Sequence, residues 1–389
     1  MTFIRKINKL DKLTLFFCAC LITIGTVAIY EATSGTKLDG LYKNNLMLFG
    51  WFCVPMLLLA FFDYRFLVGK LSYLLYGIGI ISLVLVKLKG ESLNGSSRWM
   101  SIGSFQFQPS ELAKLFTILL VAHLLQKRAG EKLRLFKDVL PITVIVLVPF
   151  FLILKQPDLG TALVFVGILL GMLWMGNIRA LYMLLLVGVV GVLVGLILWL
   201  YQANYELLTR FVHPHQLARI QTFLDPTSDP DKSWHVLNAI NAVGAGGLSG
   251  GSGYFSEHGF IPYVYSDSIY VIIGERYGFM GSAVLLMLYF LMIYRMIITI
   301  IESKRHAGRY VVVGVISMLV FQIFVNIGMH IGLLPLTGIS LPFISYGGSS
   351  LLINMVAIGL VLSVKIHNDV EDKTVIPLEP RIINIRTSQ

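Results

Sequence analysis

Long apolar runs constrain this chain more than any other feature of its sequence. A helix needs about 20 mainly apolar residues to cross a bilayer. Only 13% of the residues are charged, against about a quarter in soluble domains, and the mean hydropathy is +0.78. We therefore expect an all-α integral membrane protein with about ten transmembrane helices. The predicted spans are approximately 13–31, 45–62, 68–88, 110–127, 139–156, 159–177, 180–201, 267–300, 310–333 and 347–366.

The distribution of basic residues predicts the orientation of these spans. Most of the Lys and Arg side chains lie near the N-terminus, in alternate connections and in the C-terminal tail. Because basic segments stay inside, both termini are expected in the cytoplasm. The polar stretch 201–266 then becomes one large extracellular loop between spans seven and eight. We expect a single membrane domain over 1–366 and a polar cytoplasmic tail over 367–389. The net charge of +10 suits anionic membrane lipids and requires no nucleic-acid partner.

Asp267 stands where the long polar loop meets the eighth span. A carboxylate at that place can contact water, lipid headgroups and a membrane-held substrate together, which favours chemistry on a lipid-linked molecule. It can also simply begin the helix and stabilise its macrodipole. The residues alone favour neither the catalytic nor the structural interpretation of Asp267.

A second polar segment runs from Asn94 to Lys114 and contains Arg98 and Gln108-Pro109-Ser110-Glu111. Pro109 predicts the first turn of a helix. Glu111 and Lys114 are then one turn apart and can pair. The pair either neutralises itself at the start of the span or lines a polar cavity, since charges within membranes usually face the protein interior.

Further features lie on the predicted outer side. Asp158 follows Pro157 in a tight turn, where capping of the next helix is the favoured interpretation. Glu275 and Arg276 are expected to neutralise each other inside the bundle. The glycine-rich run 244–253 is expected to let the backbone approach substrate or to bend between short helices. A group of cations on this side runs against the positive-inside rule and suggests an anionic ligand such as a lipid diphosphate: Arg98, Lys114, Lys155, Arg210 and Arg219.

These segments occur together with Asp267-Ser-Ile-Tyr-Val-Ile-Ile-Gly-Glu-Arg and with a motif that begins at Asn326 and ends in Ser345-Tyr346-Gly-Gly-Ser-Ser. In this combination and order the chain resembles the SEDS family (shape, elongation, division and sporulation), which includes RodA, FtsW and SpoVE. The resemblance covers about residues 12 to 366. It implies a peptidoglycan glycosyltransferase of the bacterial cytoplasmic membrane that polymerises lipid II with its active site facing outward. The implied partners are a class B penicillin-binding protein, other elongation or division proteins, and membrane lipids.

The resemblance also implies site residues. The family's essential acid corresponds to Asp267, its Gln-Pro-Ser-Glu-x-x-Lys motif to Gln108 through Lys114, and its arginine before Phe-Leu-Asp-Pro to Arg219. We assign catalysis to Asp267. The expected substrate-binding residues are Arg98, Gln108, Ser110, Glu111, Lys114, Arg219, Ser345 and Tyr346. The chain departs from the family pattern at Tyr263, Tyr265, Ser268, Arg276 and Ser340.

The hypothesis for the mechanism needs one base. Asp267 takes the proton of the acceptor hydroxyl while cations hold the diphosphate leaving group, so a second carboxylate is not required. No cofactor and no metal ligand cluster is indicated by the sequence, although a divalent cation (Mg or Mn) can share the charge of the diphosphates. A lipid II flippase or transporter and a scaffold for a penicillin-binding protein are the alternatives. The clustering of polar residues at the outer face, rather than at the midplane, favours the enzyme.

Overall fold

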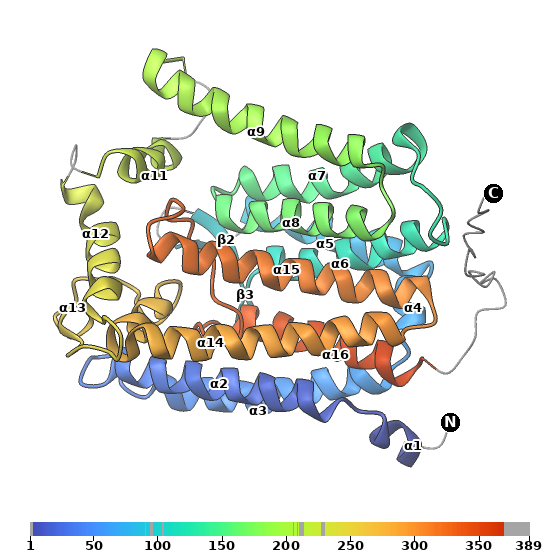
Figure 1. Cartoon of the computed structure of the whole chain (residues 1–389), viewed down its shortest axis with the longest axis horizontal. Coiled ribbons are helices and arrows are strands. Elements are labelled where there is room, and N and C mark those ends of the chain that lie inside the picture. The colour runs from blue at the N-terminus through green and yellow to red at the C-terminus, as the bar shows by residue number, and fades with distance from the viewer. Residues whose placement is uncertain are drawn as a thin grey trace, which may run out of the picture.

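The computed structural model describes residues 3–368, apart from 90, 94–95, 103–104, 205, 208, 210–213 and 227–229. The long helices run roughly parallel to one another in one bundle (Figure 1). Helix α1 (Phe3–Asn8) and the C-terminal end of α16 (Gly348–Ile366) lie at one end of it, which we call the terminal end. Helices α11 (Pro214–Leu224), α12 (Pro230–Ala245) and α13 (Tyr254–Glu257) lie at the other, the loop end. Nearly all of the predicted tail, and Arg210, fall outside the described residues.

Each of the ten predicted spans coincides with a long helix in the described part of the chain. Eight of these helices are long and apolar enough to cross a membrane, whereas α8 is short and polar residues lower the hydropathy of α6. The count of ten crossings therefore stays a prediction. The long helices are α2 (Lys12–Thr33), α3 (Leu41–Phe61), α5 (Leu71–Lys89), α6 (Pro109–Gln126), α7 (Leu140–Leu154), α8 (Leu159–Met175), α9 (Ala180–Ala203), α14 (Ile269–Glu302), α15 (His306–His330) and α16 (Gly348–Ile366). Three short helical segments are α1 (Phe3–Asn8), α4 (Tyr64–Val68) and η1 (Leu135–Val139).

Local sequence explains where several of these helices begin. Asp158 precedes α8 and accepts the backbone N–H of Thr161 at 3.1 Å, as capping predicts. Pro109 occupies the first turn of α6, where its missing N–H costs nothing. Both helix starts point toward the loop end, where they help to form the site.

One small sheet was missing from the all-α expectation. Strands β1 (Glu91–Leu93), β2 (Ser96–Ile102) and β3 (Phe105–Phe107) pair antiparallel in the order β1-β2-β3. Met100 lies opposite Phe107. Strands β1 and β3, with three residues each, are too short for a clear sequence signal, and the sheet holds Arg98 and Gln108 at the loop end.

The core follows the centre of the bundle. Helices α15 and α16 are the most buried of the candidate spans, while α9 has no buried residue and lies at the edge of the bundle (Figure 1). Helix α15 therefore carries polar side chains into the interior: Gln322, Asn326 and His330 are each at most 1% exposed. Polar groups buried at such a depth are costly unless they are bonded or functional.

Helix α14 is broken at Gly278, whose backbone angles (φ 61, ψ −153) are outside the helical region. The N–H groups of Phe279 and Met280 donate instead to the carbonyls of Gly247 and Leu248, at 2.9 and 3.0 Å. A Cβ on Gly246 would lie 1.9 Å from the carbonyl oxygen of Gly274. The glycine-rich run thus lies between the short helices α12 and α13 and packs closely against the backbone of α14, while its approach to a substrate stays a prediction.

The predicted Glu275–Arg276 pair is wrong. Glu275 accepts the N–H groups of Phe255 and Ser256 at 2.7 and 3.1 Å, which caps α13. Arg276 instead pairs with Glu257 at 2.6 Å. Adjacent residues on a helix point about 100° apart and do not face each other. Each of the two side chains therefore pairs with the loop helices instead.

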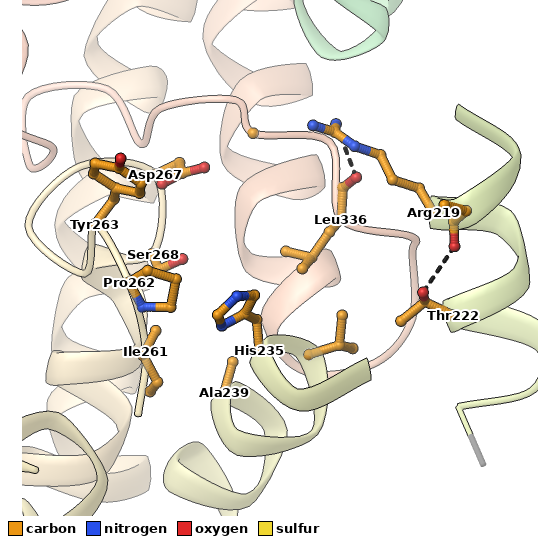
Figure 2. A pocket seen from close by; sticks show the side chains of 13 residues that line it. Arg219, Thr222, His235, Ala239, Ile261, Pro262, Tyr263, Asp267, Ser268 and Leu336 are labelled. Atoms are coloured by element: carbon orange, nitrogen blue, oxygen red, sulfur yellow. Dashed lines mark hydrogen bonds between the residues drawn. The ribbon is translucent and has the colours of Figure 1, made fainter. Parts of the chain in front are cut away.

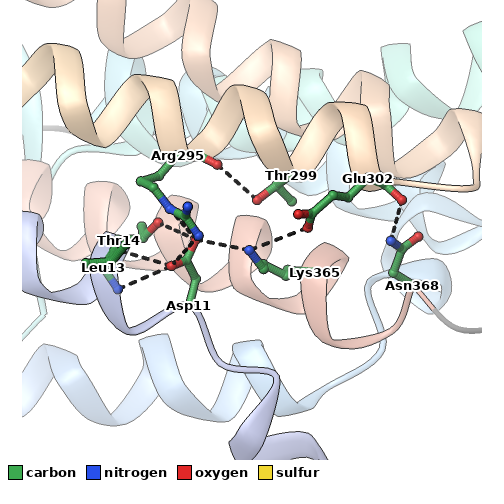
Figure 3. Close-up of polar contacts among 8 residues, drawn as sticks. All are labelled: Asp11, Leu13, Thr14, Arg295, Thr299, Glu302, Lys365 and Asn368. Atoms are coloured by element: carbon green, nitrogen blue, oxygen red, sulfur yellow. Dashed lines mark hydrogen bonds and ion pairs between the residues drawn. The ribbon is translucent and has the colours of Figure 1, made fainter.

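A charged cluster joins three helices at the terminal end (Figure 3). Asp11, only 5% exposed, accepts from Arg295 of α14 at 3.1 Å and lies 3.4 Å from the Lys365 Nζ of α16. Burial acts to raise the pKa of Asp11, but Lys365 and Arg295 outweigh it and leave that pKa below its ordinary value. Asp11 also caps α2 by accepting from Leu13 and Thr14. The cluster is fully bonded and serves the architecture.

Candidate active site

Two cavities meet at Asp267. The first, of about 320 Å³, lies among α11, α12, residues 261–268 and residues 336–338, and Figure 2 shows its lining. The second, of about 350 Å³, lies among β2 and the beginnings of α6 and α8, and reaches down to Gln322 of α15. The residues common to both linings are Arg219, Tyr263, Asp267 and Gly338. The predicted catalytic acid therefore stands at the junction of two spaces.

The backbone around Asp267 is held from two sides. Asn326 of α15 donates from Nδ2 to the carbonyl of Asp267 at 2.7 Å and to the carbonyl of Ile339 at 2.6 Å. Gly338, at φ +77, passes so close that a Cβ there would lie 3.4 Å from the Asp267 Oδ2. Asn326 thus ties the turn before α14 to the segment before α16, and both segments approach the carboxylate.

Burial raises the pKa of Asp267, although the carboxylate still lines both cavities. Hydrogen bonds from its own N–H and from that of Ser268, together with the charge of Arg219, act in the opposite direction. A carboxylate with a raised pKa is a stronger base than an ordinary aspartate.

Arg219 reaches the junction from α11. Its guanidinium donates to the carbonyls of Leu336 and Thr337, at 3.1 and 2.8 Å, and the side chain approaches the cavity from a different side than Asp267 (Figure 2). Burial and the neighbouring Arg98 lower the pKa of Arg219, while Asp158 and Asp267 raise it, and the guanidinium remains charged. The sequence placed Arg219 in a long loop, and its position is set by helix α11.

Arg98 and Gln108 meet at Asp158 in the wall of the second cavity. Arg98 lies 3.6 Å from the Asp158 Oδ2 and donates to the carbonyls of Gln156 and Pro157. The Gln108 side chain donates to the same Asp158 oxygen at 3.2 Å. Asp158 therefore does more than cap α8, because it also arranges two predicted substrate-binding residues.

Glu111 and Lys114 pair inside the bundle at 2.8 Å, as their spacing predicted. Lys114 is 1% exposed and does not line either cavity, whereas Glu111 lines the second one. The Glu111 Oε2 is buried without a hydrogen-bond partner among the described residues. Both interpretations of the pair hold in part: the charges neutralise each other, and Glu111 also faces a cavity.

The other predicted binding residues differ in position. Tyr346 lines the second cavity, and its hydroxyl accepts from Asn44 at 2.7 Å. Ser110 and Ser345 are buried and line neither cavity, and Ser345 accepts the N–H of Leu341 at 2.7 Å within its turn. Direct contact of Ser110, Lys114 or Ser345 with a substrate stays a prediction.

Several residues in or near the cavities were not assigned to the site from the sequence. Tyr263, at φ +51, lines both cavities, and His235 of α12 lines the first. Gln322, Asn326 and His330 follow one another at four-residue intervals on α15, which places them on one face. An uncharged polar residue every turn inside an apolar span is the signal that could have identified this stripe.

Within the described residues, no group of three or more His, Cys, Asp or Glu side chains gathers in a way that would hold a metal ion. A divalent cation that shares the charge of a bound diphosphate remains a prediction without assigned ligands.

The family model described as cell cycle protein, FtsW/RodA/SpoVE, matches residues 11–370. The chain belongs to this family. It is 34% identical over 367 residues to stage V sporulation protein E of Bacillus subtilis (strain 168), covering 91% of this chain and 96% of that protein. It is 32% identical over 379 residues to the peptidoglycan glycosyltransferase MrdB of Escherichia coli (strain K12), covering 96% and 98%.

A solved structure of the same fold comes from a peptidoglycan synthase complex described as coordinating polymerization and crosslinking. That chain has a TM-score of 0.75 and 30% identity, covering 92% of this chain and 97% of its own length. The family membership and the apolar helices together make this chain a multi-pass membrane protein.

The departures from the FtsW/RodA/SpoVE pattern have definite places. Tyr263 and Ser268 line the cavities, and Tyr265 packs edge-on against Tyr346 with ring centroids 6.1 Å apart. Ser340 lines the second cavity and bonds Ser350 at 2.9 Å, while Arg276 pairs with Glu257. Three of these five positions thus line the cavities that meet at the acid, Tyr265 packs against the cavity residue Tyr346, and Arg276 is engaged elsewhere.

Proposed function

We propose that this chain is a peptidoglycan glycosyltransferase that polymerises lipid II at the outer face of the bacterial cytoplasmic membrane. One observation carries the proposal: the carboxylate of Asp267 stands where two cavities meet. A polymerase must bring together two substrate molecules, a donor and an acceptor, at one base. Curated relatives named peptidoglycan glycosyltransferase support the same activity.

In the proposed reaction, Asp267 accepts the proton of the acceptor's N-acetylglucosamine 4-hydroxyl. The hydroxyl oxygen forms a bond to the anomeric carbon of the donor, and the bond from that carbon to the diphosphate oxygen breaks. Undecaprenyl diphosphate leaves with the electron pair, and attack from the opposite face converts the α-linked donor into a β-linked glycan. General-base help of this kind contributes about 10²–10⁴-fold to the rate.

The two cations expected to bind the diphosphate leaving group differ in the partners that they already have. Arg98 already faces Asp158, whereas Arg219 is held chiefly by two neutral carbonyls and keeps a full positive charge near Asp267. A guanidinium fixed in this way needs no reorganisation to stabilise charge that develops on the diphosphate. We assign the diphosphate of the donor to Arg219, with Arg98 as the second cation.

The alternatives fit the geometry less well. A transporter is expected to carry its charged site near the midplane between repeated halves, whereas Asp267, Arg219 and Arg98 all lie at the loop end. A scaffold that recruits a class B penicillin-binding protein requires no acid between two cavities. We infer that such a partner, with other elongation or division proteins, binds this enzyme rather than replaces its activity.

The test is glycan-chain formation from purified lipid II by the chain co-purified with its class B penicillin-binding protein. The wild type should form polymer, and Asp267→Ala should form none while it still binds the partner. Equal polymer from both would remove the role of Asp267. An inactive wild type, in an assay where a known polymerase works, would favour the transporter or the scaffold.

A further inference from the structure

The floor of the second cavity, meaning its inner end on α15, is lined by the side-chain amide of Gln322, which has no role in the proposed reaction. Gln322 lies on α15, is 1% exposed and lines the cavity together with Asp267 and Glu111. Its Oε1 is buried and has no hydrogen-bond partner among the described residues. A buried acceptor left in this way costs about 1–3 kcal/mol, so its presence requires a reason.

Gln322 differs from the other two buried polar residues on the same face of α15, Asn326 and His330, in what its side chain contacts. Asn326 donates from its side-chain amide to the carbonyls of Asp267 and Ile339, and its own backbone carbonyl accepts from the Nδ1–H of His330 at 2.7 Å. The Asn326 Oδ1 and the His330 Nε2 are also buried without a partner among the described residues, but neither residue lines the two cavities. Gln322 is the member of the three that lines a cavity.

The electrostatics of the floor favour an uncharged ligand group. The Oε2 of Glu111 is a second buried acceptor without a partner and lines the same cavity. The ammonium of Lys114, 2.8 Å from the other Glu111 oxygen, already balances that carboxylate. A cation would meet the repulsion of Lys114, and a phosphate would meet two acceptors, whereas an O–H or N–H group suits both oxygens.

We propose that Gln322 is a substrate-contacting residue that accepts a hydrogen bond from a hydroxyl or amide N–H of the saccharide of the lipid-linked substrate. This inference rests on the proposed function for the identity of the substrate. It assigns the sugar to the floor of the second cavity and leaves the diphosphate to Arg219 and Arg98.

The experiment compares wild type with Gln322→Met, which keeps the size of the side chain and removes its polar atoms. Binding of lipid II and of undecaprenyl diphosphate, which has no sugar, is measured by titration in detergent, and polymer formation is followed in parallel. Gln322→Met should weaken lipid II binding by about 10- to 100-fold, because the sugar donor loses its acceptor. Binding of undecaprenyl diphosphate should not change.

Thr117→Val is the matched control. Thr117 is 0% exposed on α6, its hydroxyl also has no partner among the described residues, and it lines neither cavity. Its replacement should leave the binding of both lipids unchanged. Gln322→Leu serves as a second apolar variant should Gln322→Met fail to fold.

Each outcome separates the inference from the proposed function. Unchanged lipid II binding by a folded Gln322 variant, or equal weakening for both lipids, would overturn the inference even if the wild type polymerises. Selective weakening for lipid II would support it. Selective weakening with a wild type that forms no polymer would sustain the sugar contact and overturn the polymerase.

Discussion

The two ends of the bundle both hold charged clusters, but among the described residues only one of them has all of its buried oxygens bonded. At the terminal end, the Asp11 carboxylate forms ion pairs with Arg295 and Lys365 and accepts hydrogen bonds from two backbone N–H groups of α2. Neither of its oxygens is left without a partner. At the loop end, buried oxygens of Glu111 and Gln322 have no partner among the described residues, and Asp267 lines two cavities. A cluster that satisfies itself stabilises the fold, whereas one that does not is suited to a ligand.

The largest effect that separates the two ends is expected from exchanging their acids for amides. Asp267→Asn should lower the polymerisation rate by about 10²–10⁴-fold, because the general base is lost. Its thermal midpoint should stay at or above that of the wild type, since a buried charge disappears. Initial rates on lipid II and thermal unfolding in detergent measure both quantities. Asp11→Asn is the matched control and should retain the rate; a similar rate loss in both variants would contradict the comparison.

Replacing the arginines gives the second largest contrast. Arg219→Met should lower the rate by about 10²–10³-fold, as removal of a fixed charge-stabilising donor does in other enzymes. Arg295→Met at the terminal end removes the same guanidinium from a buried acid and should change the rate little. Steady-state kinetics with a check of folded fraction tests the pair. Equal rates for wild type and Arg219→Met would exclude Arg219 from diphosphate binding.

For stability the order of the two acids should be reversed: Asp11→Asn should destabilise the protein more than Asp267→Asn. Asp11→Asn keeps an acceptor for the α2 cap but removes the charge that faces Arg295 and Lys365. We expect the free energy of unfolding to fall by about 1.5–3 kcal/mol, the range for hydrogen bonds to charged groups. Equilibrium unfolding in detergent measures it. A stability loss no greater than that of Asp267→Asn would place the two acids in one class.

The smallest effect concerns pH. Asp267 acts as a base only when ionised, and burial raises its pKa. The acid limb of the pH–rate profile should therefore lie above the ordinary range of an aspartate, with activity lost as the pH falls through the raised pKa. Because Arg219 acts to lower that pKa, the residual activity of Arg219→Met should show the limb displaced to higher pH. An unmoved limb would assign it to another group.

The sequence predicted the helices better than it predicted the site. Ten apolar runs, Pro109 as a helix start and the Glu111–Lys114 pair follow from local periodicity and spacing, and all appear in the structure. The contacts of Arg219 with residues 336 and 337 join segments more than 100 positions apart, which no local pattern contains. The Glu275–Arg276 prediction failed for the same reason, since their partners come from the loop helices.

The break at Gly278 has a consequence for the order of assembly. The carbonyls of Gly247 and Leu248 are synthesised before the N–H groups of Phe279 and Met280 that they accept. The loop helices therefore cannot take up their final place until the first part of α14 has left the ribosome. Since Asp267 lies between these two segments, the acid acquires its surroundings only when both have met, and a nascent chain that ends before α14 holds no preformed site.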